Sequence, residues 1–315
     1  MKKKGRGPWL NLLDKSEALT LLLEFMACRL FSFNNQQSTV RGYLAAIKFF
    51  HKRYLGWELT TSHCMIAAAG KGIDRFRGMS GKNAQVRLPL TWSILAHGYL
   101  TVTSSQEGGD VMWLGLALSY SLLCRASELF AYANGLVHPD FCLTRDCLTF
   151  FRGDLQVNIE DRARADSVKV LFVASKTDQN REGRTTTRVR MAEGAGVGKT
   201  PVGAFEALVE LLDAHPRLPG GAALMTRRTV SGWKVITRIE AVVALRMMAA
   251  SAGKNPAQFA LHSGRIGGAT KLAAQGMSEL QIQRAGRWKS RAFMVYVRDA
   301  GEGAQRVSAA LTREG

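Results

Sequence analysis

The residues best suited to chemistry lie near the end of the sequence, in "LHSGRIGGATKLAAQGMSELQIQRAGRWKSRAFMVYVR" at 261–298. His262 and Arg265 are three residues apart, a spacing that lets one helix present both side chains to the same anion. Trp288 and Tyr296 follow in a stretch dense with arginine. An indole N–H donates a hydrogen bond but transfers no proton, whereas a histidine can exchange one with a tyrosine. The segment therefore has the groups needed to bind a phosphate and attack it with a phenolic oxygen.

Capping patterns divide this segment into three expected helices. Ser263 is a candidate cap for the first, and a helix N-terminus offers free N–H groups to a phosphate. Ser278 and Gln281 form a capping-box pattern for a second helix, which ends near Gly286. Ser290 is expected to cap a third helix, which carries the tyrosine.

The surrounding fold must hold these helices together. Gly264, Gly267 and Gly268 would let the first helix approach a neighbouring backbone closely. The longest apolar run, "VMWLGLALSYSLLC" at 111–124, has 14 residues. A bilayer span needs about 18 or more, so this run is expected to be a buried helix and no membrane partner is expected.

The whole segment resembles the catalytic box of the tyrosine recombinase (phage-integrase) family. The signature of that family is a His-x-x-Arg, then a His or Trp, then the nucleophilic Tyr. Here those positions are His262, Arg265, Trp288 and Tyr296. Two details depart from the pattern: Gly264 stands where a larger apolar residue is often found, and the interval from the tryptophan to the tyrosine is one residue shorter than in several bacterial relatives.

The same resemblance extends upstream. The family has its first catalytic Arg at the end of a buried helix, three residues before an acid, and "LLCRASELF" supplies Arg125 and Glu128. Its catalytic Lys lies in a β-hairpin turn, for which "ASKTDQNREGR" supplies Lys176, with Lys169 in the preceding strand as a rival. "SKTDQ" and "GRWKSRAF" further resemble recombinases carried by eukaryotic mobile elements.

This resemblance implies that DNA is cleaved and rejoined through a 3′-phosphotyrosyl link at Tyr296. Arg125 and Arg265 would hold the charge that builds on the phosphate, and Lys176 would protonate the departing 5′ oxygen. His262 would exchange the proton of the tyrosine. The link keeps the energy of the broken bond, so neither ATP nor a metal nor another cofactor is expected. The expected partner is double-stranded DNA, bound by a homo-tetramer on paired sites.

The tail from about residue 299 has two possible docking surfaces. Gly301 and Gly303 should end the helix before it, and residues 304–311 resume apolar residues at helical spacing. So short a segment needs a surface to dock on. Relatives in the family dock such a tail on the neighbouring protomer; packing on its own domain is the alternative.

The charge of the chain also favours a nucleic-acid partner. Lys and Arg number 43 against 25 Asp and Glu, which gives a net charge of +18 and a pI near 10.1. A globular protein this basic usually binds a polyanion, with an anionic membrane surface as the lesser alternative.

The five cysteines are an odd number with no CxxC pair, and His63 beside Cys64 lacks partners at ligand spacing. Reduced thiols in the nucleus of a eukaryotic host, or otherwise in the cytoplasm, fit this better than disulfides or zinc.

Two domains are expected in the 315 residues: a helical core-binding (SAM-like) DNA-binding domain over 1–84 and a mixed α+β catalytic domain over 85–315. The fold class is therefore mostly α with a small antiparallel β-sheet.

In "STVRGYLAAIKFFHKRYLG", one helical stripe is apolar, and it comprises Val40, Tyr43, Leu44, Ile47, Phe50 and Tyr54. Another face carries Arg41, Lys48 and Lys52, which are candidate DNA contacts. "CLTFF", "LQVNI", "VKVLFVA" and "TTTRVRM" are the expected strands.

Three other functions are weaker fits. "GAGVGKTP" at 194–201 lacks the first glycine of a nucleotide-binding loop, because Glu193 stands there. A type IB topoisomerase shares the chemistry, but its helical boxes differ in order and spacing. A recombinase-derived DNA-binding protein that no longer cuts is the third alternative, against which the complete set of catalytic residue types argues.

Overall fold

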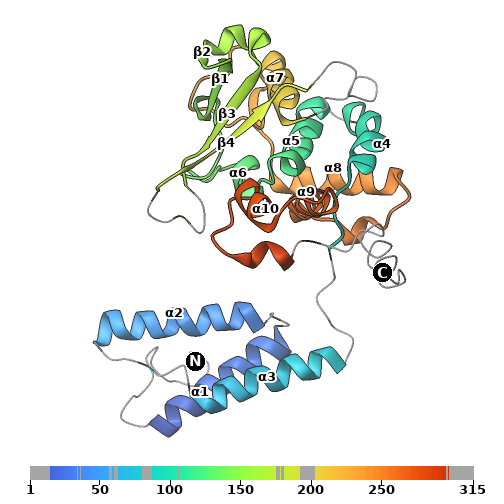
Figure 1. Cartoon of the computed structure of the whole chain (residues 1–315). Helices are drawn as coiled ribbons and strands as arrows, with labels where there is room; N and C mark the ends of the chain where they lie inside the picture. Colours follow the sequence, from blue (N-terminus) through green and yellow to red (C-terminus); the bar gives the residue numbers. More distant parts are fainter. Residues whose placement is uncertain are drawn as a thin grey trace, which may run out of the picture. The chain divides into compact units, whose positions relative to one another are not determined.

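The structure is a computed structural model, and its internal contacts divide the chain into two compact units, Met1–Gln85 and Val86–Gly315 (Figure 1). It describes residues 15–33, 35, 37–56, 59, 63–79, 87–105, 107–174, 178, 181–191, 203–295 and 297. Each unit has its own hydrophobic core.

The first unit is helical. Its described elements are α1 (Lys15–Ala27), a π-helical turn (Cys28–Ser32), α2 (Gln37–Leu55) and α3 (Cys64–Met79). Leu44 of α2 is buried with residues of α1 and α3, but three members of the expected apolar stripe are not: Tyr43, Phe50 and Tyr54 are 38%, 48% and 66% exposed. Among the described residues of α2, the hydrophobic core extends as far as Ile47, and the rings of Phe50 and Tyr54 stack on each other with centroids 6.0 Å apart.

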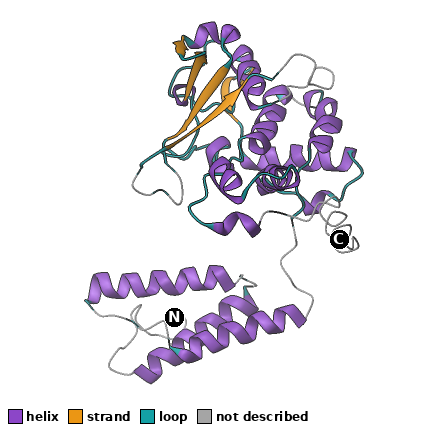
Figure 2. Cartoon of the chain, in the orientation of Figure 1, coloured by secondary structure: helices purple, strands orange, loops and turns teal. Residues whose placement is uncertain are grey.

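The second unit combines helices with a small antiparallel sheet, as predicted. Figure 2 shows the strands gathered on one side of this unit and most of its helices on the other. Its described α-helices are α4 (Trp92–Thr103), α5 (Gly109–Ser121), α6 (Ala126–Leu129), α7 (Ala204–Ala214), α8 (Arg238–Ser251), α9 (His262–Ala274) and α10 (Glu279–Ala285). Short 3-10 turns cover Arg145–Cys147, Ile159–Arg164, Pro256–Gln258 and Arg291–Val295.

The larger sheet has the strand order β2-β1-β3-β4, with every neighbouring pair antiparallel. Its strands are β1 (Leu148–Arg152), β2 (Leu155–Val157), β3 (Ser167–Phe172) and β4 (Arg184–Val189), and a separate hairpin joins β5 (Thr226–Thr229) to β6 (Gly232–Val235). Side chains alternate along β3, so Val168, Val170 and Phe172 enter the core while Lys169 lies on the opposite, exposed face.

The buried helix expected from the apolar run is α5. It is enclosed on nearly all sides, and it packs against α4, α7 and α9. Trp113 Nε1 donates a hydrogen bond to the carbonyl of Leu95, 2.8 Å away, so the indole is satisfied inside the core. α9 approaches its neighbours as closely as its glycines allow: a Cβ on Gly267 would collide with the carbonyl oxygen of Leu90, and one on Gly268 with that of Tyr120. The predicted close approach is confirmed.

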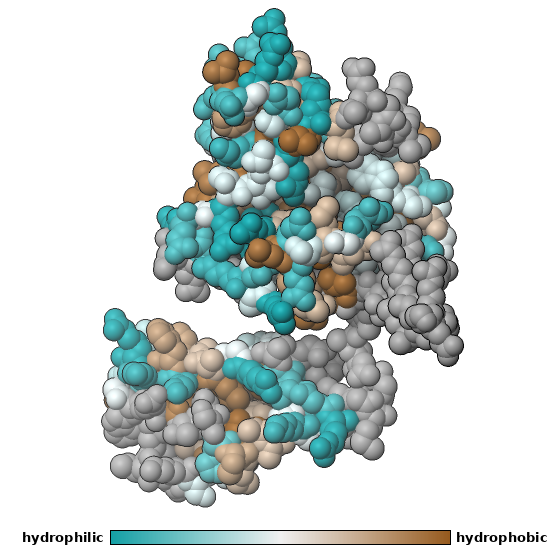
Figure 3. Space-filling model, in the orientation of Figure 1, coloured by the Kyte–Doolittle hydropathy of each residue, from teal (hydrophilic) through white to brown (hydrophobic). Residues whose placement is uncertain are grey.

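On the face of the second unit drawn in Figure 3, small groups of hydrophobic residues stand among hydrophilic ones. On the first unit, the exposed Phe49, Phe50 and Tyr54 of α2 contact one another. Among the helices that the structure describes, none is both long enough and apolar enough to span a bilayer.

Candidate active site

The site is built on the turn that follows α5. Leu123, with a φ of 50°, ends the helix and leads into α6, whose N-cap is Arg125. Glu128 accepts the backbone N–H of Arg125 on Oε2 at 2.8 Å and its Nη1 on Oε1 at 2.9 Å. Because Glu128 is only 1% exposed, this carboxylate fixes the guanidinium of Arg125, whose side chain remains 20% exposed.

α9 contributes the next two predicted residues, His262 and Arg265. His262 begins the helix, so Ser263 lies within the first turn instead of at the N-cap; its buried hydroxyl accepts the N–H of Ala260 at 3.2 Å. Arg265 is 1% exposed and donates from its two terminal nitrogens to the carbonyls of Leu123 and Gly286. The guanidinium of Arg265 is therefore not open to the phosphate that this arginine is expected to bind.

Trp288 covers Arg265. The guanidinium carbon lies 4.1 Å from the centroid of the indole ring, in cation–π contact. Trp288 also packs with Phe293, and Val297 contacts the same apolar cluster. The helix that leads to this corner is α10, which has the predicted capping box between Ser278 and Gln281.

The last expected helix is only a 3-10 turn over Arg291–Val295. Tyr296 itself lies outside the described residues, as do Lys176 and the tail from residue 299. The rival Lys169 is described: its Nζ lies 4.9 Å from the ring centroid of Phe151, on the exposed face of the sheet and opposite the core face that carries Phe172.

Positive charge dominates the electrostatics of the site. Burial, and then the charges of Arg125 and Arg287, lower the pKa of Arg265 to about 9, yet the group stays ionised at neutral pH. The residue His262 is exposed, but its ring is desolvated by neighbouring atoms; this desolvation, then Arg265 and Arg125, lowers its pKa below 6.5. Burial raises the pKa of the Cys124 thiol to about 12, so the cysteine beside Arg125 is no nucleophile.

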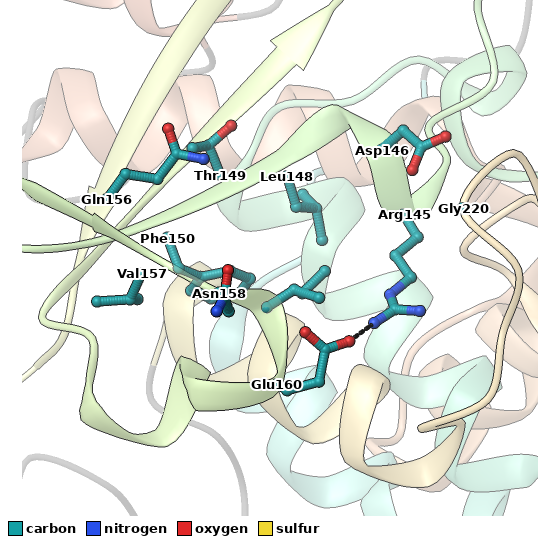
Figure 4. A pocket seen from close by; sticks show the side chains of 11 residues that line it. Arg145, Asp146, Leu148, Thr149, Phe150, Gln156, Val157, Asn158, Glu160 and Gly220 are labelled. Atoms are coloured by element: carbon teal, nitrogen blue, oxygen red, sulfur yellow. Dashed lines mark hydrogen bonds and ion pairs between the residues drawn. The ribbon is translucent and has the colours of Figure 1, made fainter.

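A separate pocket lies at the β1–β2 edge of the sheet (Figure 4). It has a volume of about 370 Å³, and its lining includes Asp146, Asn158 and the ion pair between Arg145 and Glu160. It contains none of the predicted catalytic residues. The described residues also hold no cluster of three or more His, Cys, Asp or Glu side chains that could bind a metal.

Comparisons with known proteins identify the fold. No protein-family model and no curated protein matches the sequence. Among solved structures, the Tn1549 transposon integrase in complex with circular intermediate DNA is similar with a TM-score of 0.52 and 13% identity, over 96% of this chain and 87% of that one. The XerH site-specific recombinase in a post-cleavage complex with palindromic difH substrate gives 0.51 and 13%, over 93% and 71%. The chain has the tyrosine recombinase fold.

Within this tyrosine recombinase fold, the predicted residues of the second unit that are described lie together at the end of α5. They are Arg125, Glu128, His262, Arg265 and Trp288. Figure 1 shows α6 and α9 close to α5, and α10 close to α9. In the first unit, Arg41, Lys48 and Lys52 share one face of α2; Arg41 and Lys52 are exposed and Lys48 is half-buried.

Two further arginines near this site were not predicted from the sequence. Arg287 is 4% exposed and donates to Glu128 Oε2 at 2.7 Å. Arg188, in β4, donates to the carbonyl of Ser121 at 3.3 Å, and its pKa is lowered by burial and then by Arg287. The only sequence signal for Arg287 was its place beside Trp288, because arginine is abundant throughout the chain.

Proposed function

We propose that the chain is a site-specific DNA recombinase or integrase that cleaves and rejoins DNA through a 3′-phosphotyrosyl intermediate at Tyr296. One observation carries the proposal: Arg125, Arg265 and Trp288 converge at one corner of a tyrosine recombinase fold, with Glu128 as the carboxylate that orients Arg125. Such a group of donors matches the charge of a phosphodiester under attack.

In this mechanism, the guanidinium of Arg125 is the one already placed to meet a phosphate, because Glu128 orients it and part of it faces solvent. Arg265 also binds the phosphate when one of its hydrogen bonds to a carbonyl, such as that of Gly286, is replaced by a hydrogen bond to a phosphate oxygen. Trp288 donates its indole N–H to the phosphate. The phenolic oxygen of Tyr296 attacks phosphorus while His262 accepts the phenolic proton, and the 5′ oxygen leaves with a proton from Lys176. The energy of the broken bond stays in the phosphotyrosyl link, so no nucleotide is consumed.

The first unit would bind the same DNA. Its residues 1–84 form the proposed core-binding domain, and the basic face of α2 with Arg41, Lys48 and Lys52 would contact the phosphate backbone. Double-stranded DNA is the proposed partner, and four copies on two paired sites are the proposed assembly. Docking of the tail from residue 299 on the neighbouring copy would join them.

DNA affinity should fall steeply with salt. Two units that together contact at least about four phosphates give a slope of log K against log[salt] of magnitude above about 3. Arg41→Gln and Lys52→Gln should each reduce this magnitude by about 1, because each removes one phosphate contact. Fluorescence anisotropy at several salt concentrations measures the slope. Lys254→Gln, in an exposed loop of the second unit, is the control. A wild-type slope below about 3 would contradict the two-unit clamp.

The fall of the cleavage rate at acidic pH should disappear when His262 is replaced. The lowered pKa keeps the ring neutral, and able to accept a proton, at pH 7 and down to below 6.5. The wild-type rate should therefore be flat near neutrality and fall only below pH 6.5, whereas His262→Gln should be slow and independent of pH in that range. Because the pKa of His262 is lower in the folded chain than in the unfolded chain, the unfolded chain binds a proton here more readily. The free energy of unfolding should therefore also fall as the pH drops below 6.5. An unchanged fall of the rate at acidic pH in the glutamine variant would remove His262 from the proton transfer.

A suicide substrate with a nick beside the cleavage site tests the function itself. The fragment between nick and break diffuses away, so a covalent protein–DNA adduct accumulates if the tyrosine attacks. A DNA-binding protein that no longer cuts forms no adduct, and this result would overturn the proposal. A type IB topoisomerase forms the adduct but joins no second site, so joining of two sites separates it from a recombinase.

A further inference from the structure

Arg287 adopts a backbone conformation that suits glycine. Its φ is 57°, and Leu123 has a φ of 50°. The two residues are two of the three non-glycine residues with positive φ in the part of the chain that the structure describes. They also meet, since Arg287 Nη2 donates to the carbonyl of Leu123 at 3.4 Å. A side chain that holds its residue in an unfavourable backbone conformation must make contacts that offset the cost.

The contacts of Arg287 join three elements. Nη1 donates to the carbonyl of Leu122 at 2.9 Å, at the end of α5. Nη2 donates to Glu128 Oε2 at 2.7 Å, in α6. The guanidinium carbon lies 3.4 Å from the ring centroid of Phe172, the last residue of β3. A neutral or shorter side chain at this position cannot make this set of contacts.

Through Glu128, this arginine reaches Arg125. The buried carboxylate is shared: Oε2 accepts Arg287 and the backbone N–H of Arg125, while Oε1 accepts the guanidinium of Arg125. Arg287 therefore fixes the orientation of the carboxylate on one side, and the carboxylate fixes Arg125 on the other.

Through the backbone, Arg287 also reaches Arg265 and Trp288. It stands between Gly286, whose carbonyl accepts Arg265, and Trp288, whose ring covers the same guanidinium. The corner 286–288 is thus held to the end of α5 by the side chain of Arg287.

We propose that Arg287 is a positioning residue for phosphate binding and cleavage: it sets the guanidinium of Arg125 through Glu128 and places Arg265 and Trp288 through the corner 286–288. The inference rests on the proposed function. It adds a residue that never touches the DNA but determines whether the groups that touch it are aligned.

Three variants test this role. Arg287→Gly removes the side chain and suits the backbone, so lost contacts cannot be confused with strain. Arg287→Lys keeps the charge but loses the fork of donors. The matched control is Arg227→Met, since Arg227 is 8% exposed and pairs with Glu240 at 2.6 Å, away from the predicted catalytic residues.

The decisive measurement is the single-turnover rate of adduct formation at saturating DNA, with the Kd measured alongside. Misplaced catalytic groups typically cost about 100-fold, so Arg287→Gly should slow cleavage by about that factor while the Kd changes less than threefold. Arg287→Lys should recover part of the rate, and Arg227→Met should leave the rate of the folded protein unchanged. Adding Glu128→Gln to Arg287→Gly should cost little more, because both changes break one chain of contacts. A wild-type rate in Arg287→Gly would overturn the inference.

Hydrogen exchange separates this inference from the proposed function. If the wild-type chain forms no adduct, the function fails, and exchange at the Arg125 amide, which donates to Glu128, still tests the role of Arg287. That amide should exchange at least about tenfold faster in Arg287→Gly than in wild type, and at the wild-type rate in Arg227→Met. Equal exchange in all three proteins would show that Arg287 does not hold Glu128.

Discussion

Replacing Tyr296 with phenylalanine is expected to abolish covalent attachment to DNA and to leave DNA affinity nearly unchanged. The hydroxyl is the proposed nucleophile, and removal of a nucleophile lowers a rate by on the order of 10⁴-fold or more. One hydroxyl contributes little to binding of a chain with a net charge of +18, most of whose affinity comes from contacts with phosphates. The measurement is the yield of protein–DNA adduct on the nicked suicide substrate, together with a binding isotherm.

Tyr132→Phe is the matched control for this prediction. Tyr132 is 38% exposed in the same unit, and the guanidinium of Arg238 lies 4.1 Å from its ring centroid. Loss of its hydroxyl should leave the adduct at the wild-type level. An adduct formed by the Tyr296→Phe protein would show that another residue attacks the phosphate, and the assignment of the nucleophile would be wrong.

Local patterns predicted those parts of the fold that depend on neighbouring residues in the sequence. The apolar run at 111–124 predicted the buried α5, and Ser278 with Gln281 predicted the cap of α10. The pattern failed where burial depends on a partner elsewhere in the chain. Phe50 and Tyr54 continue the apolar stripe of α2, but both are exposed and lie outside the core that α2 forms with α1 and α3 among the described residues.

In the candidate site, too, some contacts follow from local spacing in the sequence and others depend on distant segments. Arg125 and Glu128 are three residues apart, so their contact could be anticipated from spacing. The bond between Arg287 and Glu128 joins residues 159 positions apart in the sequence, and only the fold brings them together. The burial of Arg265 was equally hidden, because it depends on the cover by Trp288 and on two carbonyls from separate segments.

Alanine at Arg125 or at Arg265 should slow cleavage by about 10²–10³-fold, the effect of removing one donor to a transition-state oxygen. The two variants should differ in stability. Arg265→Ala leaves the carbonyl of Gly286 without its Arg265 donor and the carbonyl of Leu123 with only the 3.4 Å bond from Arg287. It also removes the support under Trp288, so the free energy of unfolding should fall by about 2–4 kcal/mol. Arg125→Ala should cost about 1 kcal/mol, because Glu128 keeps its bond to Arg287.

Urea denaturation and single-turnover cleavage of the two variants separate these effects. Rates are compared at a temperature where both proteins are fully folded, so that the lower stability of Arg265→Ala does not enter the rate. A loss of cleavage in both variants, with DNA affinity retained, assigns both guanidiniums to the transition state. If Arg265→Ala loses stability but cleaves as fast as wild type, its guanidinium stays bonded to the carbonyls of Leu123 and Gly286 during the reaction. Arg125 would then be the only arginine of the two that holds the phosphate.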